Sequence, residues 1–258
     1  MTAARPPLIV ITTSDPKRSD DPALAERKNE LYADAIRRHG GDPAMVSPAT
    51  PQAKRLKLLA TMAGLLLSGG SDVDPALSGA SKDGTGPHES DRDALERQAW
   101  LDAERRGLPV LGICRGLQAI NVFSGGSLLA DVPDHAGTPY GQGEAQFHDL
   151  EVEPHSRLGR AIAAAAPDGV AAGDPDDPFL ELQVNTYHHQ AVGENLLAKT
   201  LRPVAWAYSG QGRLVEGLES TDSRWVVGIQ CHPERRESTP DELEGLFESF
   251  VAAARGAA

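Results

Sequence analysis

The sequence predicts an α/β fold of three layers, in which helices flank a mostly parallel central sheet of the flavodoxin-like kind. In the first half of the chain, short apolar runs typical of buried strands alternate with longer helical segments. Strands separated by helices imply right-handed crossovers and hence parallel pairing. The second half is richer in turns and adds short extra strands. We expect a single domain over residues 1–258.

The first half supplies the core elements. Leu8–Ile11 is a predicted strand, and a helix is expected from Asp21 to His39, because Pro22 suits a first helical turn. Ser90 and Asp93 form a capping-box pattern that begins another helix. The remaining predictions are a strand at Gly64–Leu67, the end of the second helix near Arg106, and a strand at Pro109–Ile113.

The second half contains four short apolar runs and a final helix. The segment Pro167–Pro178 is rich in Pro, Gly and Asp, and we interpret it as a surface loop because strand patterns resume directly after it. The predicted strands are Asp149–Val152, Glu181–Val184, Leu214–Glu219 and Val226–Gln230, and the final amphipathic helix runs from Pro240 to about Ala254.

Composition excludes several classes of function. The net charge of −12 argues against binding to nucleic acid, which needs clustered Lys and Arg. No apolar run approaches the roughly 20 residues of a membrane helix, and Leu8–Ile11 is too short for a signal-peptide core. Cys114 and Cys231 are the only cysteines, so we expect two reduced thiols and a cytoplasmic protein. A homo-oligomer is compatible with the sequence, which fixes no oligomeric state.

Cys114 lies between a predicted buried strand and a predicted helix. Gly112 and Gly116 flank it two residues away on each side, which is the G-x-nucleophile-x-G pattern of a nucleophile elbow. Bulky side chains would clash at so sharp a turn. The amino end of the following helix should favour the thiolate, the reactive form of cysteine. The alternative is a buried structural cysteine, but such a residue has no need of flanking glycines.

A histidine and a carboxylate follow the last predicted strand. His232 and Glu234 could serve as the base for a thiol nucleophile and as the group that orients the base. By itself the His-x-Glu pattern is weak, since a solvated turn would also explain it. It gains weight because it falls at a strand end, as Cys114 does, and ligands of parallel sheets lie at the carboxyl ends of strands.

The chain resembles the class I glutamine amidotransferase-like superfamily, and is most similar to its γ-glutamyl-γ-aminobutyrate hydrolase branch. Four motifs carry the resemblance in the family's order: Ser68-Gly69-Gly70-Ser71-Asp72-Val73, Gly112-Ile113-Cys114-Arg115-Gly116-Leu117-Gln118, Tyr187-His188-His189-Gln190-Ala191-Val192 and Gly228-Ile229-Gln230-Cys231-His232-Pro233-Glu234. They span most of the chain, and agreement of all four is very specific.

The resemblance implies a role for each matching residue. Cys114 would be the nucleophile, His232 the base and Glu234 the orienting group, with the backbone N–H groups of Gly70 and Arg115 forming the oxyanion hole. The γ-glutamyl group would be lined by Gly69, Gln118, His188, His189 and Gln190. The substrate would be a small γ-glutamyl amide, and neither a cofactor nor a metal is implied.

Each of the weaker motifs has a plainer interpretation. The Gly69-Gly70 pair could be an ordinary turn. His188-His189 could belong to a zinc site, but neighbouring residues of a strand point to opposite faces and neither HExxH nor CxxC accompanies them. Asp72-Val73-Asp74 lacks the further ligands of a calcium loop. The run Asp91-Arg92-Asp93 also matches a family pattern, but acids are common at a helix amino terminus.

Two departures from the family pattern bear on the substrate. Relatives often carry an aromatic residue directly before the base histidine, and this chain has Cys231 there. Because side chains alternate along a strand, the Cys231 thiol should point away from the site. The loop Asp74–Pro87 lacks a tyrosine that many relatives have. That loop and Pro133–Phe147 are expected to shape the pocket of the leaving amine, which the sequence does not identify.

Two other functions remain open at this point. A glutaminase subunit that delivers ammonia to a separate synthase partner would use the same three residues, although the Asp-Val and His-His-Gln motifs favour a stand-alone hydrolase. A non-catalytic binding protein on the same fold is the other alternative, because fold does not imply function.

Overall fold

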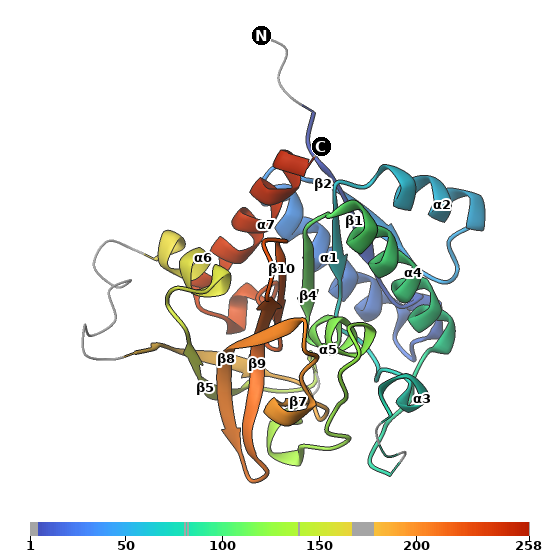
Figure 1. The fold of residues 1–258 in the computed structure, drawn as a ribbon. Helices are drawn as coiled ribbons and strands as arrows, with labels where there is room; N and C mark the ends of the chain where they lie inside the picture. Colours follow the sequence, from blue (N-terminus) through green and yellow to red (C-terminus); the bar gives the residue numbers. More distant parts are fainter. Residues whose placement is uncertain (1–4, 80, 82, 139, 167–177, 258) are drawn as a thin grey trace.

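The computed structural model describes residues 5–79, 81, 83–138, 140–166 and 178–257. In this part of the chain, ten strands form one mixed sheet in the order β2-β1-β3-β4-β10-β9-β8-β5-β6, and β7 pairs with β9 (Figure 1). The pairs that join β2, β1, β3, β4 and β10 are parallel, and the pairs from β10 onward are antiparallel. The predicted α/β class and the extra strands of the second half are confirmed.

The strand bounds are β1 Leu8–Thr12, β2 Asp42–Val46, β3 Gly64–Leu67, β4 Val110–Ile113, β5 Gln146–Val152, β6 Leu180–Thr186, β7 Val192–Gly193, β8 Leu201–Ser209, β9 Gly212–Ser220 and β10 Val226–Ile229. The helices are α1 Pro22–Arg38, α2 Gln52–Thr61, α3 Pro75–Ser78, α4 Ser90–Arg106, α5 Arg115–Phe123, α6 Arg157–Ala165 and α7 Glu244–Ala257. The short 3₁₀ turns are η1 Pro16–Arg18, η2 Pro133–His135, η3 Glu194–Leu196, η4 Arg236–Ser238 and η5 Asp241–Leu243.

The core lies on both faces of the sheet. On β1, Ile9 and Ile11 belong to the core cluster that also contains residues of α1, α6 and α7, whereas Val10 belongs to the cluster that contains residues of α2, α4 and α5. Figure 1 shows these helices on the two sides of the sheet. A parallel strand covered on both faces is apolar at every position, and this explains why short continuous apolar runs marked β1, β3 and β4 in the sequence. None of the described helices is both long and apolar enough to cross a membrane.

Two strands that the sequence analysis did not predict contain proline, which cannot donate to a strand ladder. Pro43 is tolerated because β2 is at the edge of the sheet. Pro203 lies where the register of β8 against β9 shifts, and such bulges also accommodate proline. The predicted loop Pro167–Pro178 lies outside the described residues, except for Pro178.

The capping-box prediction for α4 is wrong, although the helix has the predicted bounds. No side chain caps its amino end. The Ser90 hydroxyl donates instead to Asp74, at 3.1 Å, and the Asp93 carboxylate accepts from the Asp74 N–H, at 3.1 Å, and pairs with Arg115. A buried arginine competes for Asp93 more strongly than an exposed N–H group can. The last helix also differs, because it begins with the 3₁₀ turn η5 before α7.

Candidate active site

Cys114 is held in a strained turn between β4 and α5. Its φ of 54° is the only positive value for a non-glycine residue among those described. A Cβ atom on Gly112 would lie 2.6 Å from the backbone of Gly116, and one on Gly116 would overlap the carbonyl of Leu67. Both flanking positions therefore need glycine, and the turn can close against β3. Such strain persists only where the surroundings enforce it, which is typical of functional sites.

The sheet register brings His232 to the same place. β4 and β10 pair in parallel, with Ile113 opposite Ile229, and the Cys114 N–H donates to the Ile229 carbonyl at 2.8 Å. The segments that follow the two strands therefore leave the same edge of the sheet. Cys114 and His232 both line one cavity of about 550 Å³.

Glu234 orients the His232 ring. Its Oε1 lies 2.6 Å from His232 Nδ1, and the Tyr32 hydroxyl lies 3.4 Å from the same nitrogen. The backbone of His232 is fixed by Asn185, which accepts from its N–H at 2.9 Å and donates to its carbonyl at 3.2 Å. Because Nδ1 is engaged by the carboxylate, Nε2 is the nitrogen left for proton transfer. Cys231 packs in the hydrophobic core and is absent from the cavity lining that the structure describes.

Burial governs the protonation of the three groups. It raises the pKa of the Cys114 thiol to about 12, and Glu234 and Glu216 add to the rise, whereas Arg235 and the N–H of Arg115 oppose it. The N–H of Arg115 at the helix terminus favours the thiolate, as expected, but desolvation outweighs this effect. The thiol needs a base to lose its proton.

His232 is suited to take that proton. Burial, assisted by Arg235 and Lys28 and opposed by Glu234, holds the pKa of His232 below its usual value, so the ring is neutral near pH 7. Burial opposes the charge of Glu234, but His232 and Arg235 hold the pKa of this carboxyl below its usual value. The pair thus consists of a neutral imidazole and a carboxylate that can stabilise the imidazolium.

The turn after β3 carries the predicted oxyanion donor Gly70. A Cβ atom there would overlap the guanidinium of Arg92, which also donates to the carbonyls of Ser68 and Gly69 at 3.0 Å each. The Gly69 N–H donates to the Tyr32 hydroxyl at 3.1 Å. The other predicted donor, the Arg115 N–H, follows Cys114 directly and lowers the pKa of its thiol.

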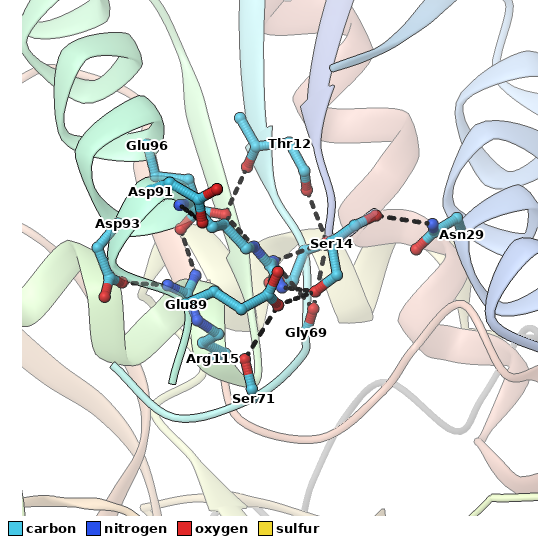
Figure 2. Close-up of polar contacts among 12 residues, drawn as sticks. Thr12, Ser14, Asn29, Gly69, Ser71, Glu89, Asp91, Asp93, Glu96 and Arg115 are labelled. Carbon is cyan, nitrogen blue, oxygen red and sulfur yellow. Dashed lines mark hydrogen bonds and ion pairs between the residues drawn. The ribbon is translucent and has the colours of Figure 1, made fainter. Parts of the chain in front are cut away.

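A buried ion-pair network holds this turn and the Cys114 turn together (Figure 2). Arg92 Nε lies 2.8 Å from Glu96 Oε1, and the side chain of Arg115 pairs with both Glu96 and Asp93. Thr12, at the end of β1, donates to Glu96 at 2.9 Å. These charged side chains are at most 1% exposed. The sequence run Asp91-Arg92-Asp93 is therefore more than a helix terminus, because its last two residues belong to the network.

The cavity is also lined by residues that the sequence analysis missed. Arg235 lies over both Tyr140 and Tyr187, whose ring centres are 4.4 and 4.3 Å from the guanidinium carbon. Its Nη1 has no hydrogen-bond partner among the described residues. Lys28 of α1 lies 5.6 Å from the centre of the Tyr140 ring. Only Arg235, directly after the Glu234 motif, and Tyr187, within a motif, had a signal in the sequence.

Of the predicted substrate-binding residues, Gln118, His188 and Gln190 meet at the Gln190 carbonyl, whereas Gly69 and His189 lie elsewhere. Gly69 lines the cavity. Gln118 is buried and donates to the Gln190 carbonyl at 2.9 Å, and neither residue is part of the lining that the structure describes. The neighbouring side chains of His188 and His189 point apart. The His188 ring lies 3.6 Å from Glu216, and the His189 ring lies 2.9 Å from Asp72. Both partners are distant in sequence, so the sequence alone did not reveal them.

Comparison with known proteins identifies relatives over most of the chain. The family model of peptidase C26 matches residues 7–234. The chain is 32% identical to a "Putative glutamine amidotransferase" of Mycobacterium tuberculosis, over 87% of this chain and 67% of that one. It is 31% identical to the γ-glutamyl-γ-aminobutyrate hydrolase PuuD of Escherichia coli K12, over 87% of this chain and 85% of that one.

A solved structure shares the fold. It is that of a "putative gmp synthase subunit a protein" from Thermoplasma acidophilum, with a TM-score of 0.59, 18% sequence identity, and coverage of 98% of this chain and 96% of that one. At this identity the likeness supports the fold alone.

Replacing Glu96 with Gln should disrupt the site and the fold together. The change leaves Arg92 and Arg115 buried without full compensation, so we expect a loss of about 3–5 kcal/mol in the free energy of unfolding. The matched control is Glu30→Gln, which removes an exposed partner of Arg37 and should cost about 1 kcal/mol or less. Urea unfolding of both variants tests this, and equal losses would show that the network is unimportant.

The pH dependence of turnover should report His232 rather than a preformed thiolate. Because the pKa of His232 lies below its usual value and that of Cys114 is about 12, kcat/KM should stay nearly constant between about pH 7 and pH 9. It should fall only at acid pH, below the usual histidine range, as His232 becomes protonated. A tenfold rise per pH unit through the neutral range would contradict this, since it would mean that thiolate formation limits the rate.

Proposed function

The chain belongs to the peptidase C26 family, and on that premise we propose that it is a cysteine-dependent hydrolase that cleaves a γ-glutamyl amide to glutamate and an amine. One observation carries the proposal. Cys114, in a strained turn with φ of 54°, opens onto the same cavity as His232, whose ring is oriented by Glu234 at 2.6 Å. Such a nucleophile with a base and an orienting carboxylate is the arrangement that acyl transfer requires.

The proposed reaction has two stages. As the Cys114 sulfur attacks the γ-carbonyl carbon, His232 takes the thiol proton and a tetrahedral intermediate forms. His232 then gives this proton to the amine nitrogen, the C–N bond breaks, and a γ-glutamyl thioester remains. Water, whose proton goes to His232, attacks the thioester, and collapse returns the proton to the sulfur and releases glutamate. No step needs a metal or a cofactor.

The oxyanion hole is proposed to consist of the Gly70 and Arg115 N–H groups. Support comes from the position of the Arg115 N–H, which is near enough to the attacking sulfur to lower the pKa of the Cys114 thiol. The Arg92 guanidinium fixes the turn that carries Gly70. Donors held in place before the reaction need no reorganisation when charge develops on the carbonyl oxygen, and each is typically worth about 3 kcal/mol.

The charges of the cavity suit a substrate with a carboxylate. Lys28 and Arg235 contribute cationic groups, and Asp15 and Glu89 contribute carboxylates. A γ-glutamyl amide has an α-ammonium and an α-carboxylate group, and γ-glutamyl-γ-aminobutyrate has a second carboxylate on its leaving amine. We propose that the unpaired Nη1 of Arg235 receives the carboxylate of the leaving amine, and the resemblance to the PuuD hydrolase supports γ-aminobutyrate as that amine.

We also propose that the protein acts in the cytoplasm. Both cysteines are free and buried, and the proposed chemistry requires Cys114 as a thiol. A reducing compartment maintains that state.

Glutamate release by the purified chain tests the proposed function directly. The substrates are γ-glutamyl-γ-aminobutyrate, glutamine and γ-glutamyl-anilide. Cys114→Ala should lower turnover of the first by at least about 10⁴-fold, since it removes the nucleophile. The matched control Cys231→Ala removes the other buried thiol and should leave turnover of the same order.

A Cys114→Ala variant with near-wild-type turnover would refute the assignment. Slow release from all three substrates, with Cys114 still labelled by a thiol reagent, would favour a glutaminase subunit that needs a synthase partner. Failure of the reagent to label Cys114 selectively over Cys231 would favour a non-catalytic binding protein.

Arg235→Gln should act on the leaving amine. It should lower kcat/KM for γ-glutamyl-γ-aminobutyrate by about 10- to 100-fold, mainly through KM, because a charged hydrogen bond is lost. The same variant should affect γ-glutamyl-butylamine far less, since that amine has no carboxylate. Arg235→Lys retains the positive charge and should recover part of the loss. Equal losses on both substrates would show that Arg235 holds the glutamyl end or acts on the triad instead.

A further inference from the structure

A cluster of three histidines and one glutamate lies outside the proposed catalytic groups. Its members come from separate parts of the fold: His135 from η2, His148 from β5, His188 from the segment after β6, and Glu216 from β9. His135, His188 and Glu216 are at most 4% exposed, and the side chain of His148 is 13% exposed. Four ligand-type side chains from four elements therefore meet in the interior.

The polar atoms of this cluster lack partners. Both carboxylate oxygens of Glu216, both ring nitrogens of His135, and the Nε2 atoms of His148 and His188 are buried without a hydrogen bond among the described residues. One such atom costs about 1–3 kcal/mol, and folded proteins contain few of them. So many in one place indicate a common partner, and a group that binds lone pairs of imidazole and carboxylate is a cation.

The geometry suits a metal ion. Ligand atoms of His135, His148 and Glu216 all lie within 4.8 Å of one another. The Nε2 atoms of His148 and His188 lie 3.6 Å from the two oxygens of Glu216. Zinc bonds of about 2.0–2.1 Å in a tetrahedron place neighbouring ligand atoms about 3.3 Å apart, so the most distant ligand atoms within the 4.8 Å range would close by up to about 1.5 Å on binding.

Two of the histidines are already oriented as metal ligands are. His148 Nδ1 lies 3.0 Å from the Asp149 carbonyl, and His188 Nδ1 lies 3.0 Å from the Gln190 carbonyl. A carbonyl can only accept, so Nδ1 carries the proton and Nε2 presents its lone pair to the cluster. A backbone carbonyl on the outer nitrogen is the usual way in which a metal-binding histidine is fixed.

We propose that His135, His148, His188 and Glu216 bind one divalent first-row transition ion, with zinc the expected metal. Imidazole with one carboxylate is a ligand set that zinc takes readily. The sequence analysis rejected zinc at His188-His189 because adjacent residues point apart, and they do. The three residues that would bind the ion together with His188 are distant from it in sequence, so no short motif could predict the site.

The ion would stabilise a wall of the cavity. Tyr187 precedes His188, and its ring packs against the His232 ring with centres 5.7 Å apart. Ala136, which lines the cavity, follows His135. Binding all four side chains to one ion would fix these two segments beside the proposed base. The ion would thus act through positioning, and the nucleophile would still be Cys114.

Metal content tests the proposal without an activity assay. The full chain, purified without chelator, is measured by elemental analysis, then stripped and titrated with Zn²⁺, and separately with Co²⁺, whose visible absorption reports nitrogen and oxygen ligands. About one zinc per chain is expected. Zinc at a hundredfold excess over its dissociation constant should raise the melting temperature by about 5–10 °C.

Variants locate the ion. Glu216→Gln and His148→Gln should abolish the stoichiometric zinc, whereas the matched control His189→Gln, at the neighbouring outward-pointing histidine, should keep it. The proposal is overturned if stripped wild-type protein binds neither Zn²⁺ nor Co²⁺ at one equivalent, a result independent of whether any variant folds. Zinc binding that survives in Glu216→Gln also overturns it. If zinc is not bound and Glu216→Gln raises KM instead, the cluster is a substrate subsite.

Discussion

The buried pairing of Arg92 and Arg115 with Glu96 is the constraint on which the geometry of the site depends. A charge in the interior is tolerated only when it is paired and hydrogen-bonded. Here each guanidinium meets that need through Glu96, and each also fixes a turn at a strand end: Arg92 of α4 donates to the turn after β3, and Arg115 follows Cys114 directly. Neither turn can shift without uncovering a charge, so the network fixes their spacing.

Such a network contributes more to position than to stability. Replacing a buried ion pair by apolar residues is often neutral, whereas removing one partner is costly. The strain at Cys114 needs enforcement of this kind, since a φ of 54° is unfavourable for any side chain. The same burial that makes the network rigid also keeps the Cys114 thiol and the His232 ring neutral. Exclusion of water thus explains both the rigidity of the network and the lowered pKa of His232. Reactivity then depends on proton transfer from the neutral Cys114 thiol to the neutral His232 ring, rather than on a thiolate–imidazolium pair that exists before the reaction.

The sequence predicted best what depends on local pattern. β3 was predicted to the residue, and the strand–turn–helix at Cys114 was recognised, because a continuous apolar run flanked by glycines has few other interpretations. β2 and β8 were missed because proline argues against a strand, and only the sheet order shows that one is at an edge and the other at a bulge. Asp93 was assigned to a helix cap because its real partner, Arg115, is distant in sequence.

His188 and His189 show why local sequence patterns could not predict the whole site. The alternation of side chains along a strand correctly predicted that His188 and His189 point in opposite directions, but it did not predict which residues each would contact. His188 meets Glu216 of β9, and His189 meets Asp72 of the turn after β3, so one dipeptide contacts two distant parts of the chain. The segment that carries it also places Tyr187 against His232. Since His188 lies beside Glu216 and Tyr187 beside Arg235, the surroundings of the proposed base rest on contacts that arise only when β6, β9 and β10 have assembled into one sheet.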